Sequence, residues 1–147
     1  MAQIVTATKN RSRGITRLQG TFTTHTDGVV TATAIGSAFG RVVAVEYDPV
    51  SGTAGATTVD TGADISLSNN SGAAFLTLTN AGVNAVRVRP TCIPVTVAGA
   101  AVTPGAGYNG TMDVYVAGPV KLTVAQGGSG KVGVVTVIVD EGDANDL

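Results

Sequence analysis

The sequence predicts an all-β fold, either a single antiparallel β-sandwich or a small β-barrel of about nine strands, on three observations. Val, Thr, Gly and Ala make up 84 of the 147 residues, and Val and Thr favour strands whereas Gly favours turns. Turn signals recur roughly every 8 to 14 residues, which is typical of a sandwich or small barrel. No window carries helical periodicity, and charged residues are only 13% of the chain, too few for a helical bundle.

The N-terminal part contains three expected strands. Ile15–Thr24 alternates weakly between apolar and polar residues and leads to Asp27-Gly28, a dipeptide typical of tight turns because Gly accepts a positive φ. Val29–Ile35 follows this turn, so we expect the two segments to pair as a hairpin. Ala38–Tyr47, which contains three valines, is the next strand.

The middle of the chain contains shorter strands. Ile65–Ser68 and Ala73–Thr79 flank the turn cluster Asn69–Gly72, which predicts a second hairpin. Ala85–Arg89 alternates valine with arginine, as a half-buried strand does. Ile93–Val97 contains a proline, which lacks a backbone donor, so we expect an edge strand at most.

The C-terminal strands are the most apolar. Met112–Val116 and Val120–Ala125 flank a Gly-Pro pair, and the turn Gln126–Gly130 follows. Lys131–Asp140 is the most apolar segment of all. We expect it to be the central strand, buried on both faces.

Charge divides the chain into an N-terminal arm (1–14), a β-domain (15–140) and an acidic C-terminal tail (141–147). The bases of the first 20 residues, where no acid occurs, are Lys9, Arg11, Arg13 and Arg17. The last eight residues carry Asp140, Glu141, Asp143 and Asp146 and no base. These ends are either solvated segments or electrostatic docking sites for another subunit or a partner. We take the four bases as the candidate partner-binding residues.

Bulk properties exclude several classes of protein. The single cysteine, Cys92, allows no intrachain disulfide. No apolar run approaches the roughly 20 residues of a membrane-spanning helix, and no signal peptide is evident, so we expect a soluble cytosolic product without membrane contact. A pI of about 5.6 and scarce aromatic residues argue against direct nucleic-acid binding.

The inventory of catalytic residues is thin, so we expect no enzyme, no metal and no cofactor. His25, the only histidine, lies at a predicted turn, which excludes sites that need several histidines. A catalytic cysteine needs a base, and His25 is the only histidine that could serve Cys92. We therefore interpret Cys92 as a small buried side chain. The carboxylate pairs Asp60/Asp64 and Glu46/Asp48 lack the aromatic platforms of a sugar hydrolase and the ligand density of a calcium loop.

Three loop segments are candidates for a functional role. Gly127–Lys131 lacks the spacing of a phosphate-binding loop and precedes a strand, so we interpret it as a hairpin turn. The long connections Asp48–Gly62 and Ala98–Thr111 carry almost no charge. We expect them to pack against another subunit, because loops of this length are usually functional.

The chain from residue 14 to 140 resembles a family of small tailed-phage virion proteins. The resemblance lies in the order of these segments: Arg17–Thr23 followed by Asp27-Gly28, then Gly40–Val43, Ala63–Leu67, Gly118–Val124 and Val132–Val135. Ser68–Gly72 departs from the more acidic turn of that family. The resemblance implies a capsid decoration (cement) protein and carries over no catalytic residue.

The expected function follows from this resemblance. A decoration protein binds the assembled shell on the virion surface, after synthesis in the host cytoplasm, and bridges major capsid subunits. Its expected partners are the major capsid protein and further copies of itself, with a trimer favoured by analogy. The alternatives are a phage tail or connector subunit and a surface-exposed β-module that binds a host protein or glycan.

Overall fold

The computed structural model describes residues 2–50, 58–92 and 112–142, in which all regular secondary structure is β-strand. The strands are β1 (Ile4–Ser12), β2 (Ile15–Thr23), β3 (Val30–Pro49), β4 (Asp64–Ser68), β5 (Ala74–Leu78), β6 (Val86–Val88), β7 (Thr91–Cys92), β8 (Met112–Asp113), β9 (Tyr115–Ala125) and β10 (Val132–Asp140). Eight strands form one antiparallel sheet in the order β1-β2-β10-β3-β9-β4-β5, with β6 paired to β3, and β7 pairs with β8. The all-β prediction is confirmed.

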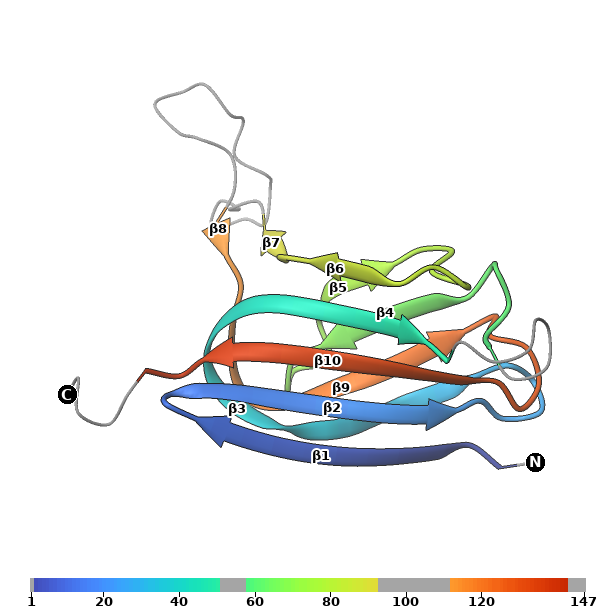
Figure 1. Cartoon of the computed structure of the whole chain (residues 1–147), viewed down its shortest axis with the longest axis horizontal. Helices are drawn as coiled ribbons and strands as arrows, with labels where there is room; N and C mark the ends of the chain where they lie inside the picture. The colour runs from blue at the N-terminus through green and yellow to red at the C-terminus, as the bar shows by residue number, and fades with distance from the viewer. Residues whose placement is uncertain (1, 51–57, 93–111, 143–147) are drawn as a thin grey trace, which may run out of the picture.

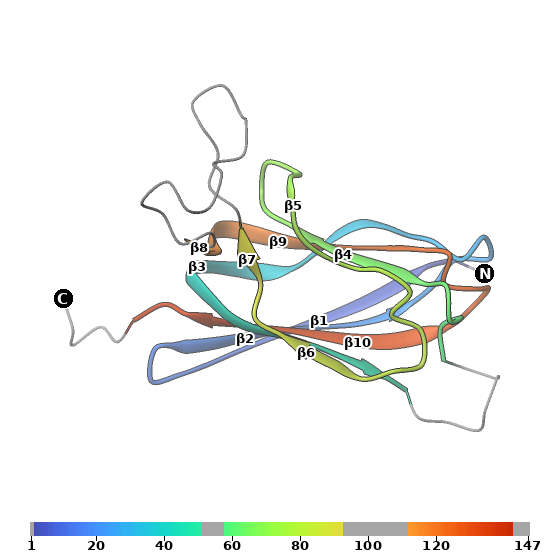
Figure 2. The ribbon, with the colours of Figure 1, turned by 90° about the horizontal axis from the view of Figure 1, so that it is seen from above.

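The long strand β3 belongs to both halves of this sheet and so creates two layers (Figures 1 and 2). Residues 41–49 of β3 pair with β10, whereas residues 30–41 pair with β9. The first layer is therefore β1, β2, β10, the C-terminal half of β3, and β6. The second layer is the N-terminal half of β3, β9, β4 and β5. Within the described residues the sheet does not close into a barrel, and the two layers fit a sandwich.

Small residues let the two layers pack closely over a single core. A Cβ on Gly20 of β2 would lie 2.6 Å from Ile35 Cγ2 of β3, and a Cβ on Gly36 of β3 would lie 2.7 Å from Leu18 Cδ2 of β2. Each large side chain thus occupies the space above a glycine of the opposite layer. The largest fully buried side chains are Tyr47, Phe22, Leu18, Ile35, Ile65, Leu67 and Leu122.

The predicted hairpin between Ile15–Thr24 and Val29–Ile35 is wrong, although its turn exists. Gly28 has a φ of 81°, and its N–H donates to the carbonyl of His25 at 2.9 Å. The chain leaving this turn enters the second layer, because β10 pairs with β2 along the whole of Ile15–Thr23. A tight turn reverses the chain equally well between layers, so the local signal did not specify the partner strand.

Two interruptions in the sequence pattern do not interrupt strands. Val29–Ile35 and Ala38–Tyr47 contribute to one strand, β3, whose register against β9 shifts near Gly36. Likewise β9 runs through Gly118 and Pro119, where two strands were expected. Such irregularities bend a strand without ending it. The turn 126–130 joins β9 to β10 in the other layer, so it is not a hairpin as predicted.

Two other strand predictions are confirmed. β4 and β5 pair as a hairpin around Asn69–Gly72. β10 is central, between β2 and β3. Its expected burial on both faces holds only in part, since Val135, Val137 and Val139 are fully buried while the alternate residues up to Thr136 remain half-exposed.

Residues 4–12, which we expected within an N-terminal arm, form the edge strand β1. It pairs with β2 from Ile4 opposite Thr23 to Ser12 opposite Ile15. The two-residue turn between them has positive φ at Arg13 (51°) and Gly14 (76°), the backbone of a type I′ hairpin. The expected arm is therefore part of the sheet from Ile4 onward.

Several predicted segments lie outside the described residues. They are Ile93–Val97, Ala98–Thr111, residues 51–57 of the first long connection, and residues 143–147 of the acidic tail. Of the first connection, Val59 is buried in the chain's own core, and Thr58 forms an isolated bridge with Val132. The expected contact of these loops with another subunit stays a prediction.

The crossing of β3 between layers requires a glycine. A Cβ on Gly40 would lie 2.1 Å from the carbonyl oxygen of Asp140, at the end of β10. Real atoms cannot approach so closely, so any side chain at Gly40 must displace the backbone of β3 or β10.

We predict that Gly40→Ala lowers the free energy of unfolding by about 3 kcal/mol, the upper end of the usual cost of overpacking, because the new methyl group collides with backbone atoms. The measurement is urea denaturation followed by far-UV circular dichroism. Gly62→Ala is the matched control. Its Cβ would meet nothing closer than 3.7 Å, and its stability should stay within about 0.5 kcal/mol of the parent. Equal stability of the two variants would contradict this role of Gly40.

Tyr47 anchors the segment before β6 to the core. Its ring is 1% exposed, and its hydroxyl donates a hydrogen bond to the carbonyl of Gly82. Burial, and secondarily the charge of Asp48, raises the pKa of Tyr47 to about 12. The neutral phenol is therefore the form that the fold stabilises.

We predict that Tyr47→Phe lowers the free energy of unfolding by about 1 kcal/mol at neutral pH, because the Gly82 carbonyl loses its donor. The parent should also lose stability above pH 10, since Tyr47 ionises first in the unfolded chain, and the variant should lack this component. Tyr115→Phe, at an exposed ring, is the control and should match the parent. Denaturant titrations at neutral pH and near pH 11 measure both effects.

Candidate partner-binding surface

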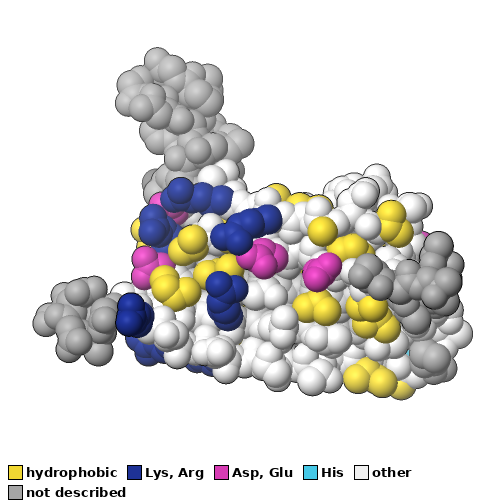
Figure 3. All heavy atoms as spheres, viewed as in Figure 1, with side chains coloured by type: hydrophobic (Ala, Val, Ile, Leu, Met, Phe, Trp, Pro, Cys, Tyr) yellow, Lys and Arg dark blue, Asp and Glu magenta, His cyan; other side chains and the backbone are white. Residues whose placement is uncertain are grey.

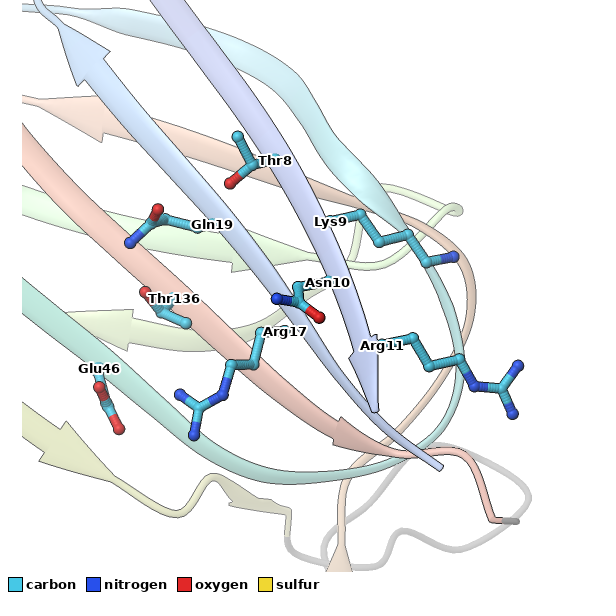
Figure 4. Close-up of a pocket in the computed structure, with 8 residues that line it drawn as sticks. All are labelled: Thr8, Lys9, Asn10, Arg11, Arg17, Gln19, Glu46 and Thr136. Carbon is cyan, nitrogen blue, oxygen red and sulfur yellow. The ribbon is translucent and has the colours of Figure 1, made fainter. Parts of the chain in front are cut away.

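The four predicted partner-binding bases do not form one cluster. In the β1–β2 register, Lys9 lies opposite the buried Leu18 and Arg11 lies opposite the buried Thr16. Directly opposed residues share a face, so Lys9 and Arg11 lie on the inner side of the sheet, at its edge. Arg17 lies on the outer face, and Figure 4 shows it pointing away from Lys9 and Arg11. The fourth base, Arg13, is exposed in the turn.

Lys9 and Arg11 lie beside the C-terminal end of β10, where Glu141 connects three parts of the fold. The Glu141 carboxylate accepts hydrogen bonds from the hydroxyl of Thr16 and, at 2.9 Å, from the backbone N–H of Phe39. Its own N–H donates to the carbonyl of Gly14 at 2.8 Å. A carboxylate with donors from two strands holds the end of β10 against the β1–β2 turn and β3.

The pKa of Glu141 reflects these contacts. Partial burial alone raises it, but the hydrogen bonds from Thr16 and Phe39 and the charges of Arg11 and Lys9 outweigh burial, so the pKa is lowered. Lys9 also donates to the carbonyl of Ser37 at 2.9 Å. Basic residues near the N-terminus therefore already interact with an acidic residue near the C-terminus of the same chain.

Further ion pairs lie at the same end of the molecule. Arg41 lies 3.6 Å from a carboxylate oxygen of Asp113 and 3.5 Å from one of Asp140, and Arg89 lies 2.6 Å from Asp113. Figure 3 shows basic and acidic side chains interspersed toward this end of the face in view. Exposed pairs contribute little individually, but these connect β3, β8 and β10.

The outer face of the first layer carries a continuous polar row with apolar side chains on either side of it (Figure 3). One row of opposed residues crosses all five strands: Thr8 on β1, Gln19 on β2, Thr136 on β10, Glu46 on β3 and Arg87 on β6. Arg87 and Glu46 form an ion pair. The row offers donors and acceptors across the full width of the layer.

A shallow depression of about 560 Å³ lies at the β1 edge of the first layer, where it takes in the β1 end of this row. Its lining residues are Thr8, Lys9, Asn10, Arg11, Arg17, Gln19, Glu46 and Thr136, which Figure 4 shows spread along the strands. Arg17 supplies the positive charge on the outer side. Such an open polar surface suits contact with another macromolecule better than it suits enclosed chemistry.

The catalytic and metal candidates lie on several different segments of the fold. His25 lies in the exposed connection from β2 to β3, with Nδ1 3.1 Å from Asp27 Oδ1, and Cys92 lies in β7. Asp64 accepts the backbone N–H of Asn80 at 3.0 Å. Among the described residues, no group of three or more His, Cys, Asp or Glu side chains could hold a metal ion.

The paired carboxylates Glu46 and Asp48 share a face of β3, because they lie opposite Thr136 and Val134 of β10. Glu46 is engaged with Arg87, however. The Glu46 carboxylate therefore has an ion-pair partner on the outer face of the first layer.

Two exposed aromatic residues were missed by the sequence analysis. Phe39 on β3 is 64% exposed, and Tyr115 on β9 is 66% exposed. The sequence does contain a signal for Tyr115, because it lies between Val114 and Val116. Alternation along a strand directs the residue between two inward-facing valines outward, and both valines are buried.

Comparison of the chain with models of protein families, with curated proteins and with solved structures finds no match. In the part of the chain that the structure describes, no helix has the length and apolar character needed to cross a membrane.

We predict that Glu141→Gln lowers the free energy of unfolding at pH 7 by about 1–2 kcal/mol, because the hydrogen bonds to a charged acceptor weaken. The folded pKa lies below the usual 4.5, so the parent's extra stability is fully present above pH 4.5 and is lost as pH falls through the folded pKa. The variant should show a smaller acid loss in urea titrations between about pH 3 and pH 7.

Glu46→Gln is the control for Glu141→Gln, because it makes the same chemical change in the exposed pair with Arg87. Its stability should change by less than about 1 kcal/mol. If both variants keep the parent's acid profile, Glu141 does not hold the end of β10.

Proposed function

We propose that this chain is a structural virion protein, a capsid decoration protein of a tailed phage that binds the assembled shell and bridges neighbouring major capsid subunits. The observation that carries the proposal is the open polar row across all five strands of the first layer, from Thr8 to Arg87. The resemblance of residues 14–140 to small virion proteins supports it as well.

The proposed mechanism depends on a broad contact surface and does not require a binding pocket. The outer face of the first layer lies across the junction between shell subunits, and Arg17 contacts an acidic group there. Because this contact exists only on the assembled shell, binding stabilises the shell by mass action. Lys9 and Arg11, whose charges already act on Glu141, contribute less than Arg17.

The proposal also includes self-association, with a trimer favoured because closed symmetric oligomers are the rule for such proteins. The mass of the purified protein, from light scattering or native mass spectrometry, tests this part. A trimer supports the decoration function, whereas a hexameric ring or tube supports a tail or connector subunit.

We predict that Arg17→Glu lowers the occupancy of the protein on assembled particles about tenfold at low salt, because a base on the docking face becomes an acid. The measurement is co-sedimentation of the purified protein with undecorated particles over a range of salt concentrations. The difference between parent and variant should shrink as salt rises.

Lys121→Glu is the matched control, since it makes the same change of charge on β9 in the second layer. Its occupancy should equal that of the parent. Unchanged binding of Arg17→Glu, or equal losses for both variants, would overturn the assignment of the docking face to the first layer. Failure of the parent protein to bind any particle would overturn the proposed function itself.

A further inference from the structure

The second layer, which the proposed docking leaves uncovered, has its own surface depression beside an exposed aromatic ring. This depression of about 350 Å³ is lined by Asn69, Asn70, Ser71, Tyr115 and Ala117. Its volume falls in the range of small-ligand sites. None of the five side chains carries a charge at neutral pH, so the surface matches a neutral ligand with hydroxyl groups and an apolar face.

The ring of Tyr115 forms one wall of the depression. It is 66% exposed, yet it begins β9, and its two neighbours in the chain, Val114 and Val116, are buried in the core. A large apolar ring on a well-anchored strand presents contact area at low cost in conformational entropy. The electron-rich face of such a ring attracts the C–H groups of a ligand.

The turn between β4 and β5 forms the polar wall and is already ordered. Asn69 Oδ1 accepts the N–H of Ser71 at 3.1 Å and its hydroxyl at 2.6 Å. The N–H of Gly72 donates to the Asn69 carbonyl at 3.0 Å, and the N–H of Asn69 donates to the Ala73 carbonyl at 3.0 Å. A turn held by four hydrogen bonds loses little freedom when a ligand binds.

The bonds within this turn determine what it offers a ligand. Because the Ser71 hydroxyl donates to Asn69, its remaining lone pairs accept from outside. The exposed amide of Asn70 supplies both a donor and an acceptor. The amide nitrogen of Asn69 adds two donors. Alternating donors and acceptors are what adjacent sugar hydroxyls require, since each hydroxyl both donates and accepts.

We propose that this depression is a binding subsite for a neutral carbohydrate. One apolar C–H face of a pyranose ring stacks on Tyr115, and its hydroxyl groups bond with Asn70 and Ser71. The site goes beyond shell docking, because it lies on the layer that docking leaves exposed and needs no particle to be measured. A decoration protein with this site would present a sugar-binding surface outward.

The test is saturation-transfer NMR of the isolated full chain with the methyl glycosides of glucose, galactose, mannose and N-acetylglucosamine. At least one of them should show transfer to the C–H protons of one ring face, with a Kd of roughly 1 mM, as expected for a small ligand in an open site. Tyr115→Ala should weaken binding about tenfold or more, and Tyr115→Phe, which keeps the ring, should retain it.

Ile4→Ala is the matched control. Ile4 is a large apolar side chain, 58% exposed, but it lies on β1 in the first layer. Its substitution should leave sugar binding unchanged. Equal losses for Ile4→Ala and Tyr115→Ala would indicate general adhesion to exposed apolar side chains and overturn the site.

Asn70→Ala provides a second, polar test. It lies in an exposed turn, so the variant should fold normally and lose part of the affinity. Absence of transfer to all four glycosides overturns the proposal, as does binding of methyl sialoside alone, because that ligand is anionic. Either result leaves the particle-binding experiment with Arg17→Glu unaffected.

Discussion

The passage of β3 through both layers is the constraint on which the other features depend. This strand bonds to β9 through its first half and to β10 through its second, so the spacing between layers is set by one continuous backbone. The crossing is possible only because Gly40 lets the end of β10 lie against it. The Glu141 carboxylate then closes the same corner through Phe39 and Thr16. Both candidate surfaces are the outer faces that this arrangement creates.

The unusual composition of the chain has an explanation inside the molecule. Gly20, Gly36 and Gly133 each leave room for a large side chain, namely Ile35, Leu18 and Phe22. Close packing over a core of mostly valine needs such small positions, because few side chains in the chain are large enough to fill wide gaps. The abundance of glycine therefore reflects close packing inside the molecule.

Local patterns in the sequence were enough to predict the fold class, the β4–β5 hairpin and the central place of β10, because alternation and turn residues act over a few positions. They were not enough to predict which strands pair with one another. Asp27-Gly28 makes the same turn whether the chain pairs with itself or changes layer, and Arg13-Gly14 was not recognised as a type I′ turn.

The candidate surfaces depend on this pairing even more strongly. Lys9 and Arg17 are close in sequence but lie on opposite faces, because the register of β1 against β2 decides the side of each. The depression beside Tyr115 joins β9 to a turn more than 40 residues earlier in the chain. Neither juxtaposition follows from sequence spacing, since both arise from long-range strand order.

The order β1-β2-β10 has a mechanical consequence. β1 and β10 both run antiparallel to β2, so they are parallel to each other on either side of it. Tension between the start of β1 and the end of β10 pulls along the strands, and it loads the backbone hydrogen bonds of both ladders in shear, all at once. Peeling, which breaks such bonds singly, needs a pull across the strands. The described termini are thus placed so that a stretching force meets the most resistant direction of the sheet.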